Sequence, residues 1–155
     1  MAEVYKLKYL TGRKLKVFLA AADRIIPPDE DSPGGGTMLS AAIVDWSLER
    51  LEPSLRRQIL ALMLGIEMMG FIFGGKPFTM NSEKAQVRQL TWLESSPVSR
   101  LRMGFFGLKT YTAMGYYTRE DIWQTIGYEG PVLPDRPYHD KVIRALCKGE
   151  MEVSA

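Results

Sequence analysis

Residues 53–75 of this chain read PSLRRQILALMLGIEMMGFIFGG, and this stretch decides the class of fold. Pro53 suits the first position of a helix, and Gly74-Gly75 ends one. Between them, apolar side chains recur every three or four residues. The main row is Leu55, Ile59, Leu62, Met63, Ile66, Met69 and Phe73, and a second row is Leu60, Leu64, Met68 and Phe71. Because the helix over 53–73 is apolar on more than one side, we expect it to be the central helix, buried around most of its circumference.

Helical spacing of apolar residues extends over most of the remaining chain. It predicts further helices over residues 12–26, 37–50, 82–95, 97–114, 118–126 and 139–148. Pro27-Pro28 ends the first of these, and Asn81 or Ser82 can cap the fourth helix of the chain. Thr118 followed by Asp121 resembles a capping box for the short helix. With no convincing strand, the 155 residues predict a single all-α domain, 1–155, built as a helical bundle.

Residues 127–137, GYEGPVLPDRP, interrupt this pattern near the C-terminus. Three prolines and two glycines in eleven residues are incompatible with a helix. The segment 127–138 is therefore expected to be an extended arm that leaves the helical body.

The charge balance excludes several classes of partner and location. Twenty Lys and Arg against eighteen Asp and Glu give a net charge of +2, which is too small to indicate nucleic-acid binding. The longest apolar stretch, Ile59–Phe73, contains Glu67 and is shorter than the roughly 20 residues that span a bilayer, so we expect no direct membrane insertion. Residues 1–10 lack a secretory or twin-arginine signal. We expect a cytoplasmic location, or a periplasmic one if a partner carries the signal.

The chain offers few groups for catalysis. His139 is the only histidine and Cys147 the only cysteine, so His-based zinc sites and disulfides are excluded within the chain. The acidic run 29–31 lacks the spacing of a calcium loop, and Gly34-Gly35-Gly36 lacks the Lys-Ser/Thr of a phosphate-binding loop. We therefore predict no catalytic, cofactor-binding or metal-binding residues in this chain.

Residues 103–128, MGFFGLKTYTAMGYYTREDIWQTIGY, are unusually rich in aromatic and Met side chains. Successive residues of a helix cannot all face one core, so part of this set is expected at the surface. Tyr, Trp and Met are enriched where proteins bind one another. The predicted partner-binding residues are Tyr116, Tyr117, Trp123 and Tyr128 as anchors, Arg119 and Arg136 as a polar rim, and Gly130 and Pro131 at the start of the arm.

Two segments of the chain form a distinctive pair of motifs. The first is Ala22-Asp23-Arg24-Ile25-Ile26-Pro27-Pro28-Asp29, which runs into Ser32-Pro33-Gly34. The second is Gly115-Tyr116-Tyr117-Thr118 followed by Ile126-Gly127-Tyr128-Glu129-Gly130-Pro131. They lie about ninety residues apart, with helices between them, and bracket most of the chain. In content and order the pair resembles the motifs of the gluconate 2-dehydrogenase subunit 3 family.

This resemblance implies that the chain is a non-catalytic small subunit. Its partner would be an FAD-dependent oxidoreductase of the glucose–methanol–choline type, often joined by a cytochrome c, and the small subunit would support the assembly and maturation of the flavoprotein. FAD would then lie in the partner and not in this chain. The sequence departs from the family because it has no twin-arginine signal, which puts an export role in doubt.

Two other functions remain open from the residues themselves. The chain could be a stand-alone helical scaffold or regulator with no redox partner. It could also be a small metal-dependent enzyme that uses the acidic residues 29–31.

Overall fold

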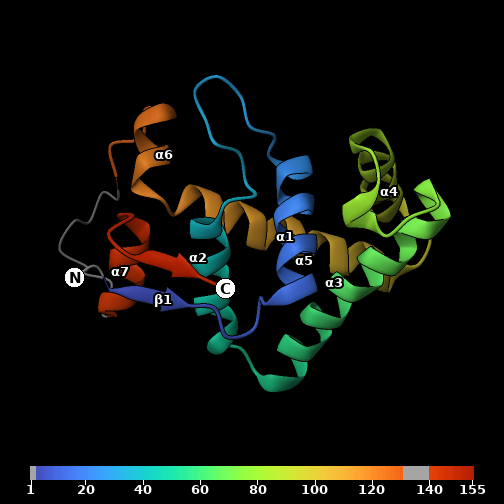
Figure 1. The fold of residues 1–155 in the computed structure, drawn as a ribbon, viewed down its shortest axis with the longest axis horizontal. Coiled ribbons are helices and arrows are strands. Elements are labelled where there is room, and N and C mark those ends of the chain that lie inside the picture. Colours follow the sequence, from blue (N-terminus) through green and yellow to red (C-terminus); the bar gives the residue numbers. More distant parts are fainter. Residues whose placement is uncertain (1–2, 131–139) are drawn as a thin grey trace.

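A computed structural model of the chain describes residues 3–130 and 140–155. Within them the chain forms seven α-helices, one short 3-10 helix and a two-stranded sheet (Figure 1). The elements are β1 Val4–Lys6, α1 Gly12–Ile25, α2 Met38–Glu49, α3 Pro53–Gly74, η1 Phe78–Met80, α4 Glu83–Ser95, α5 Ser99–Tyr117, α6 Glu120–Thr125, α7 Lys141–Cys147 and β2 Glu152–Ser154. The predicted all-α class is confirmed, and the helices lie within three residues of the expected ranges.

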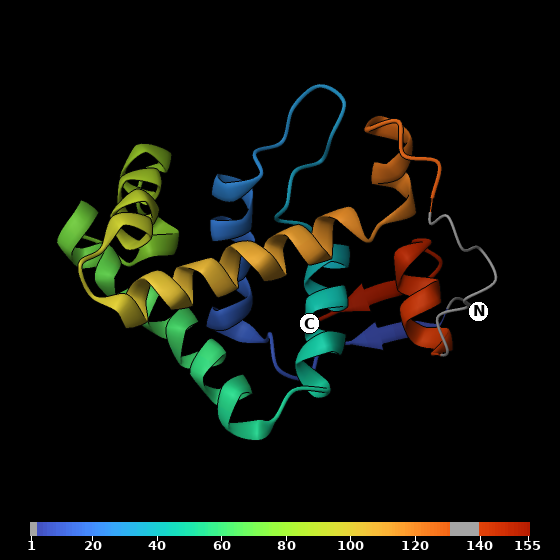
Figure 2. The same cartoon turned by 180° about the vertical axis from the view of Figure 1, so that it is seen from behind.

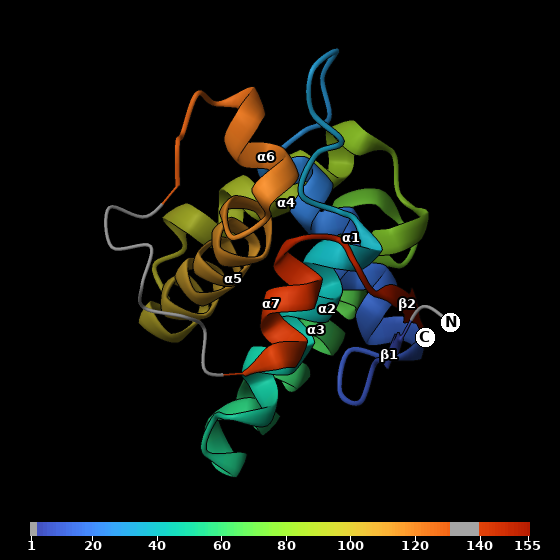
Figure 3. The same ribbon diagram turned by 90° about the vertical axis from the view of Figure 1, so that its left-hand side faces the viewer.

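The centre of the bundle is α2, which packs against α1, α5 and α7 (Figures 1 and 3). Its first half is rich in small residues, and Ser40, Ala41 and Ala42 have no solvent exposure. Gly115 of α5 faces this segment, where an added Cβ atom would lie 2.8 Å from the Ser40 carbonyl oxygen. Small residues on both helices therefore let α2 and α5 approach closely. Helix α5 itself crosses the molecule from α4 to α6 (Figure 2).

The prediction that α3 is the central, largely buried helix is wrong. Its buried residues are confined to one side, at Met63, Ile66, Glu67 and Gly70. Much of its second apolar row is exposed, and Ile72 beside that row has 80% of its surface in solvent. Helical periodicity counts apolar side chains but does not reveal whether a second apolar row meets another element. Among the described residues, α3 is the one helix whose length and composition would suffice to cross a membrane, by those two criteria alone.

Glu67 explains how a carboxylate is accommodated on the buried side of α3. Its side chain is 2% exposed, and it accepts hydrogen bonds from the Thr79 N–H at 3.0 Å and the Thr79 hydroxyl at 2.8 Å. The guanidinium of Arg13 lies 3.7 Å away. These contacts join α3 to η1 and to the start of α1, because a buried carboxylate requires donors to replace water.

The expectation that the chain has no strand is also wrong. Strands β1 and β2 pair in parallel, with Tyr5 opposite Val153, so the first and last described segments lie side by side (Figure 1). The Leu7 N–H extends the pairing by donating to the Ser154 carbonyl at 3.0 Å. Three-residue strands are too short to show the alternation of apolar and polar side chains by which a sequence indicates strands.

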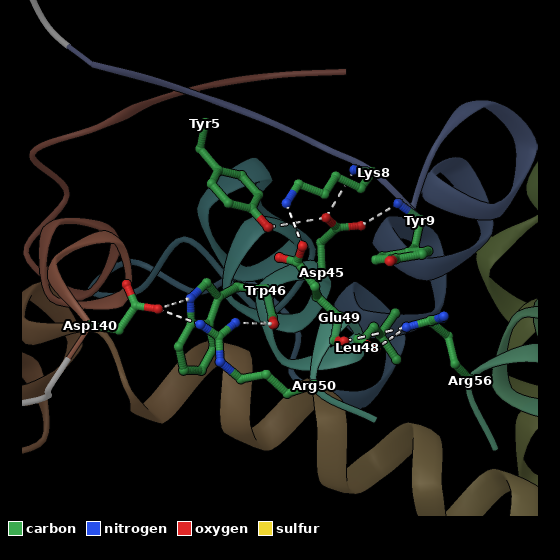
Figure 4. Close-up of polar contacts among 10 residues, drawn as sticks. All are labelled: Tyr5, Lys8, Tyr9, Asp45, Trp46, Leu48, Glu49, Arg50, Arg56 and Asp140. Atoms are coloured by element: carbon green, nitrogen blue, oxygen red, sulfur yellow. Dashed lines mark hydrogen bonds and ion pairs between the residues drawn. The ribbon is translucent and has the colours of Figure 1, made fainter. Parts of the chain in front are cut away.

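Asp45 of α2 holds the segment that follows β1, as Figure 4 shows. Its side chain has no solvent exposure, and it accepts hydrogen bonds from the N–H groups of Lys8, Tyr9 and Leu10 at 2.7–2.9 Å. The Tyr5 hydroxyl donates a fourth bond at 3.2 Å. Both oxygens are thus occupied, so Asp45 positions the backbone and is unavailable for chemistry.

Helix α7 is attached to α2 by a second acidic side chain (Figure 4). Asp140 caps α7 by accepting from the Val142 N–H at 2.8 Å, and this hydrogen bond is the main cause that lowers its pKa. It also accepts from the Trp46 indole N–H at 3.3 Å and forms an ion pair with Arg50. One carboxylate therefore both begins α7 and fixes its position.

A candidate partner-binding site

Three aromatic side chains and one aliphatic side chain lie where α5 ends and along and just after α6. They are Tyr117, Trp123, Ile126 and Tyr128, and we call them the aromatic corner. Tyr117, Ile126 and Tyr128 have 50%, 52% and 45% of their surfaces in solvent. The structure thus brings together three of the four predicted anchors, and it exposes Ile126 beside them.

Local contacts fix the geometry of the aromatic corner. The Trp123 indole N–H donates to the Tyr117 carbonyl at 2.7 Å, and the Tyr128 N–H donates to the Trp123 carbonyl at 2.8 Å. The rings of Trp123 and Tyr128 meet edge to face, with centroids 5.3 Å apart at 87°. Gly130 lies next to the Trp123 ring, where an added Cβ atom would be 3.6 Å away. The exposed rings are therefore held in place before any partner binds.

Tyr116 does not occupy the surface position expected of an anchor. It is 5% exposed, and its hydroxyl forms a short hydrogen bond with the Ser32 hydroxyl. Its ring meets that of Tyr117 edge to face at 5.0 Å. Because consecutive residues at a helix end point in different directions, Tyr116 turns inward and supports Tyr117, which remains outside.

Arg119 does not occupy the polar rim assigned to it. The residue is 5% exposed and pairs with Asp121, to which its Nε atom donates at 3.1 Å. It also donates to the hydroxyls of Thr37 at 2.8 Å and Ser40 at 3.4 Å. Arg119 is the N-cap residue of α6, so the expected capping box from Thr118 is not formed. This buried cation joins α6 to the first turn of α2.

The loop between α1 and α2 packs behind the aromatic corner. Gly36 donates its N–H to Asp23 at 2.8 Å, and an added Cβ atom there would lie 2.3 Å from the Leu19 carbonyl oxygen. Gly35 donates to the Ile26 carbonyl at 2.9 Å. These glycines therefore allow a close approach of the loop to α1, and their N–H groups are used internally instead of cradling a phosphate. Through Ser32, the first sequence motif contacts the second.

Acidic side chains surround the aromatic corner. Asp31 lies beside α6, where the Thr125 hydroxyl is 3.5 Å from its carbonyl oxygen. Asp29 and Asp31 are exposed, as are Asp121 on α6 and Glu129 beside Tyr128. Among residues 3–130 and 140–155, no group of three acidic, His or Cys side chains is placed to hold a metal ion. The exposed rings of the aromatic corner therefore have negatively charged side chains near them.

Several predicted residues fall elsewhere or outside the described residues. Pro131, Arg136 and His139, with the arm beyond residue 130, lie outside the described residues. Cys147 is buried in α7, where desolvation, with a smaller contribution from Glu120, raises the pKa of its thiol to about 11. At neutral pH the thiol is therefore protonated, which makes it a weak nucleophile.

An open groove lies between α4 and α5, on another part of the surface. Its volume is about 340 Å³, and its lining includes Arg102, Met103, Phe106 and Lys109. None of the residues predicted as a site lines it. The groove is therefore separate from the aromatic corner.

Sequence reasoning missed the residues that position the aromatic corner. Ser32 and Asp23 were seen only as parts of a motif, although each forms a hydrogen bond that orders the loop. Ile126 directly follows α6, and a helix of six residues has too little periodicity for the sequence to assign it one face.

Comparison of the chain with models of protein families, with curated proteins and with solved structures gives no match. The resemblance to the gluconate 2-dehydrogenase subunit 3 family therefore rests on the two motifs alone. The family assignment stays a prediction.

Proposed function

We propose that this chain is a non-catalytic helical subunit that binds a larger oxidoreductase through its aromatic corner. The observation that carries the proposal is the aromatic corner itself, where Tyr117 and Tyr128 are about half exposed yet fixed by their neighbours. Exposed Tyr and Trp side chains that are already ordered lose little conformational entropy on binding, which favours association.

The chemistry of the surface suggests the nature of the partner. Exposed Asp29, Asp31, Asp121 and Glu129 surround apolar rings, so the complementary surface has apolar pockets bordered by Lys or Arg. By the resemblance of the two motifs, the partner is an FAD-dependent dehydrogenase of the glucose–methanol–choline type, with or without a cytochrome c. In this assignment FAD and catalysis belong to the partner, and the small subunit supports its assembly.

The test is affinity purification of the tagged chain from its native cells, with detection of a yellow, flavin-bearing large subunit. The double variant Tyr117→Ala with Tyr128→Ala removes two exposed rings and is expected to abolish co-purification. Met103→Ala with Phe106→Ala is the matched control, since these side chains are 70% and 68% exposed in a different part of α5. Circular dichroism should report unchanged helicity for both variants.

Retention of the flavoprotein at unchanged yield by the Tyr117/Tyr128 variant would contradict the proposed surface. Recovery of the tagged chain without any flavin-bearing subunit would instead favour the alternative function, a stand-alone scaffold or regulator with no redox partner. Catalytic turnover by the isolated chain would contradict the accessory role altogether.

A further inference from the structure

The outer side of α3 carries a continuous apolar surface that no other described element covers. It consists of Ala61, Leu64, Gly65, Met68, Phe71 and Ile72, and we call it the outer face of α3. The exposed fractions of Leu64, Met68 and Phe71 are 45%, 61% and 49%, and that of Ile72 is 80%. Figures 1 and 2 show α3 running from the lower edge of the molecule up to α4. Contiguous apolar surface of this kind is typical of a binding face.

The charges on α3 are arranged in a simple way. Residues 58–75, roughly 27 Å of helix, contain one charged side chain, Glu67, which is buried on the opposite side. Exposed Arg57 precedes this stretch and exposed Lys76 follows it. Arg88 adds a third cation at the C-terminal end, where it donates a hydrogen bond to the Phe73 carbonyl. The outer face of α3 is thus apolar along its length and basic at both ends.

This charge pattern disfavours a second copy of the chain as the occupant. An antiparallel pair of α3 helices would place Arg57 of one copy beside Lys76 of the other. A parallel pair would place each cation beside itself. No acidic side chain is exposed on α3 between these two cations to offset the repulsion, so the complementary surface must be anionic.

We propose that the outer face of α3 adsorbs to an anionic lipid surface, with the helix axis in the plane of the headgroups. Leu64, Met68, Phe71 and Ile72 would enter the boundary between headgroups and acyl chains, while Arg57 and Lys76 would contact lipid phosphates. This is the arrangement of charge and apolar surface that interfacial helices share.

The helix lies on the membrane and does not cross it. Its other side packs against α1, α4 and η1, and the buried Glu67 carboxylate is bonded to Thr79 on η1. Crossing would break these contacts and place a carboxylate in hydrocarbon. Adsorption breaks none of them.

The small net charge of the chain does not oppose this orientation, because the charges are separated in space. Exposed Asp121 and Glu129 lie at α6 and the aromatic corner, whereas Arg57, Lys76 and Arg88 lie at the ends of α3. Exposed Glu52, the N-cap of α3, precedes this basic and apolar stretch, and its carboxylate accepts hydrogen bonds from the Ser54 and Leu55 N–H groups. Figure 1 shows α6 and α3 at opposite edges of the molecule. An adsorbed molecule would therefore keep its acidic edge away from the lipid and its aromatic corner accessible to a partner.

The test is sedimentation of the purified chain with lipid vesicles at neutral pH. We expect binding to vesicles containing about 30% phosphatidylglycerol in phosphatidylcholine, little binding to phosphatidylcholine alone, and release as salt rises from about 50 to about 500 mM. Absence of binding to the anionic vesicles at low salt would overturn the proposal. Equal binding to both vesicle types would overturn it as well.

Two matched variants locate the surface. Met68→Glu is expected to lower the partition coefficient onto anionic vesicles at least about tenfold, because it places a charge within the adsorbed face. Met103→Glu is the control, since Met103 is similarly exposed on α5. Circular dichroism confirms that both variants fold, and an equal loss in both would contradict α3 as the contact.

Gly65→Leu separates a lipid surface from a partner helix. Gly65 lies in the middle of the outer face of α3, and an added Cβ atom meets nothing within 4 Å. On lipid, a larger apolar side chain should preserve or strengthen vesicle binding. Weakened vesicle binding by this variant therefore overturns the lipid assignment, because a partner helix that packs closely against Gly65 is the kind of occupant that a leucine there would exclude. Because vesicle sedimentation uses the isolated chain, its outcome is independent of co-purification through the aromatic corner.

Discussion

At the scale of single residues, buried polar side chains connect segments that are distant in sequence. Arg119 connects α6 to α2, Asp45 connects α2 to the first segment, and Glu67 connects α3 to η1. Each side chain uses several of its atoms at once. Their replacement should therefore affect the position of whole segments as well as local stability.

We expect Arg119→Met to lower the free energy of unfolding by about 1–3 kcal/mol. Methionine retains the aliphatic volume but removes the donors to Thr37, Ser40 and Asp121. The exposed Asp121 can regain water, which limits the loss. Urea denaturation measures the change, with exposed Arg100→Met as the control expected within about 0.5 kcal/mol of the parent. Equal stability of the parent and Arg119→Met would contradict a connecting role for Arg119.

Alkaline pH should destabilise the fold partly through Cys147. Burial raises the pKa of its thiol from 9.0 to about 11, so between these values the unfolded thiol ionises while the folded thiol keeps its proton. The unfolded state then binds fewer protons, and stability falls as pH rises from 9.0 to about 11. Urea midpoints measured across this range should fall less steeply for Cys147→Ala than for the parent chain. If the urea midpoints of the two chains fell equally with pH, the Cys147 thiol would not contribute to the loss of stability at alkaline pH.

At the scale of the elements, α3 is packed against other elements on one side and exposed on the other, and the space around two of its glycines shows this difference. Gly70 faces inward, where an added Cβ atom would lie 2.1 Å from the Phe78 nitrogen. Gly65 faces outward into open space. The same substitution therefore has opposite expected effects within a single helix.

Gly65→Ala should raise the free energy of unfolding by about 0.5–1 kcal/mol, because alanine restricts the unfolded chain and favours the helix. Gly70→Ala should lower it by more than about 2 kcal/mol, since η1 must move away from α3. Urea denaturation of both variants and the parent chain under identical conditions measures these two changes in the free energy of unfolding. Similar values for the two would contradict the assignment of inner and outer sides.

The elements were predictable from sequence where the signal is local. The spacing of apolar residues and the positions of prolines predicted where helices lie, because both signals depend only on residues close together in the sequence. Whether Leu64 and Met68 meet a neighbour depends on the path of the whole chain, and the sequence pattern does not contain that information. The same holds for the inward turn of Tyr116 and for the pairing of Val4–Lys6 with residues far along the chain. The partner-binding role predicted for Tyr117 and Tyr128 stays a prediction.

At the scale of the whole molecule, the first described segment is held by two sets of contacts, one from β2 near the other end of the chain and one from α2. Strand β2 holds β1 and the Leu7 N–H, whereas Asp45 holds Lys8, Tyr9 and Leu10. The sheet and the carboxylate therefore hold neighbouring parts of the same segment, and the Tyr5 hydroxyl links them by donating to Asp45.

Removal of residues 152–155 should separate these two sets of contacts. We expect faster hydrogen exchange at the Leu7 amide, because its acceptor is the Ser154 carbonyl. The Tyr9 and Leu10 amides should remain protected by Asp45. Exchange measured by NMR tests this difference, and Asp45→Ala in the full chain should give the reverse pattern. Uniform acceleration in the truncated chain would show that the segment opens as one unit.

The pairing of β1 with β2 has a consequence for the order of synthesis. The first strand leaves the ribosome with its backbone donors and acceptors free, and the strand that covers them is made only after all seven described helices. During translation the nascent N-terminal edge thus has no native neighbour and can pair with foreign strands. Slow or stalled elongation at any point before β2 is made should therefore prolong the time in which β1 lacks its partner and increase aggregation of this polypeptide.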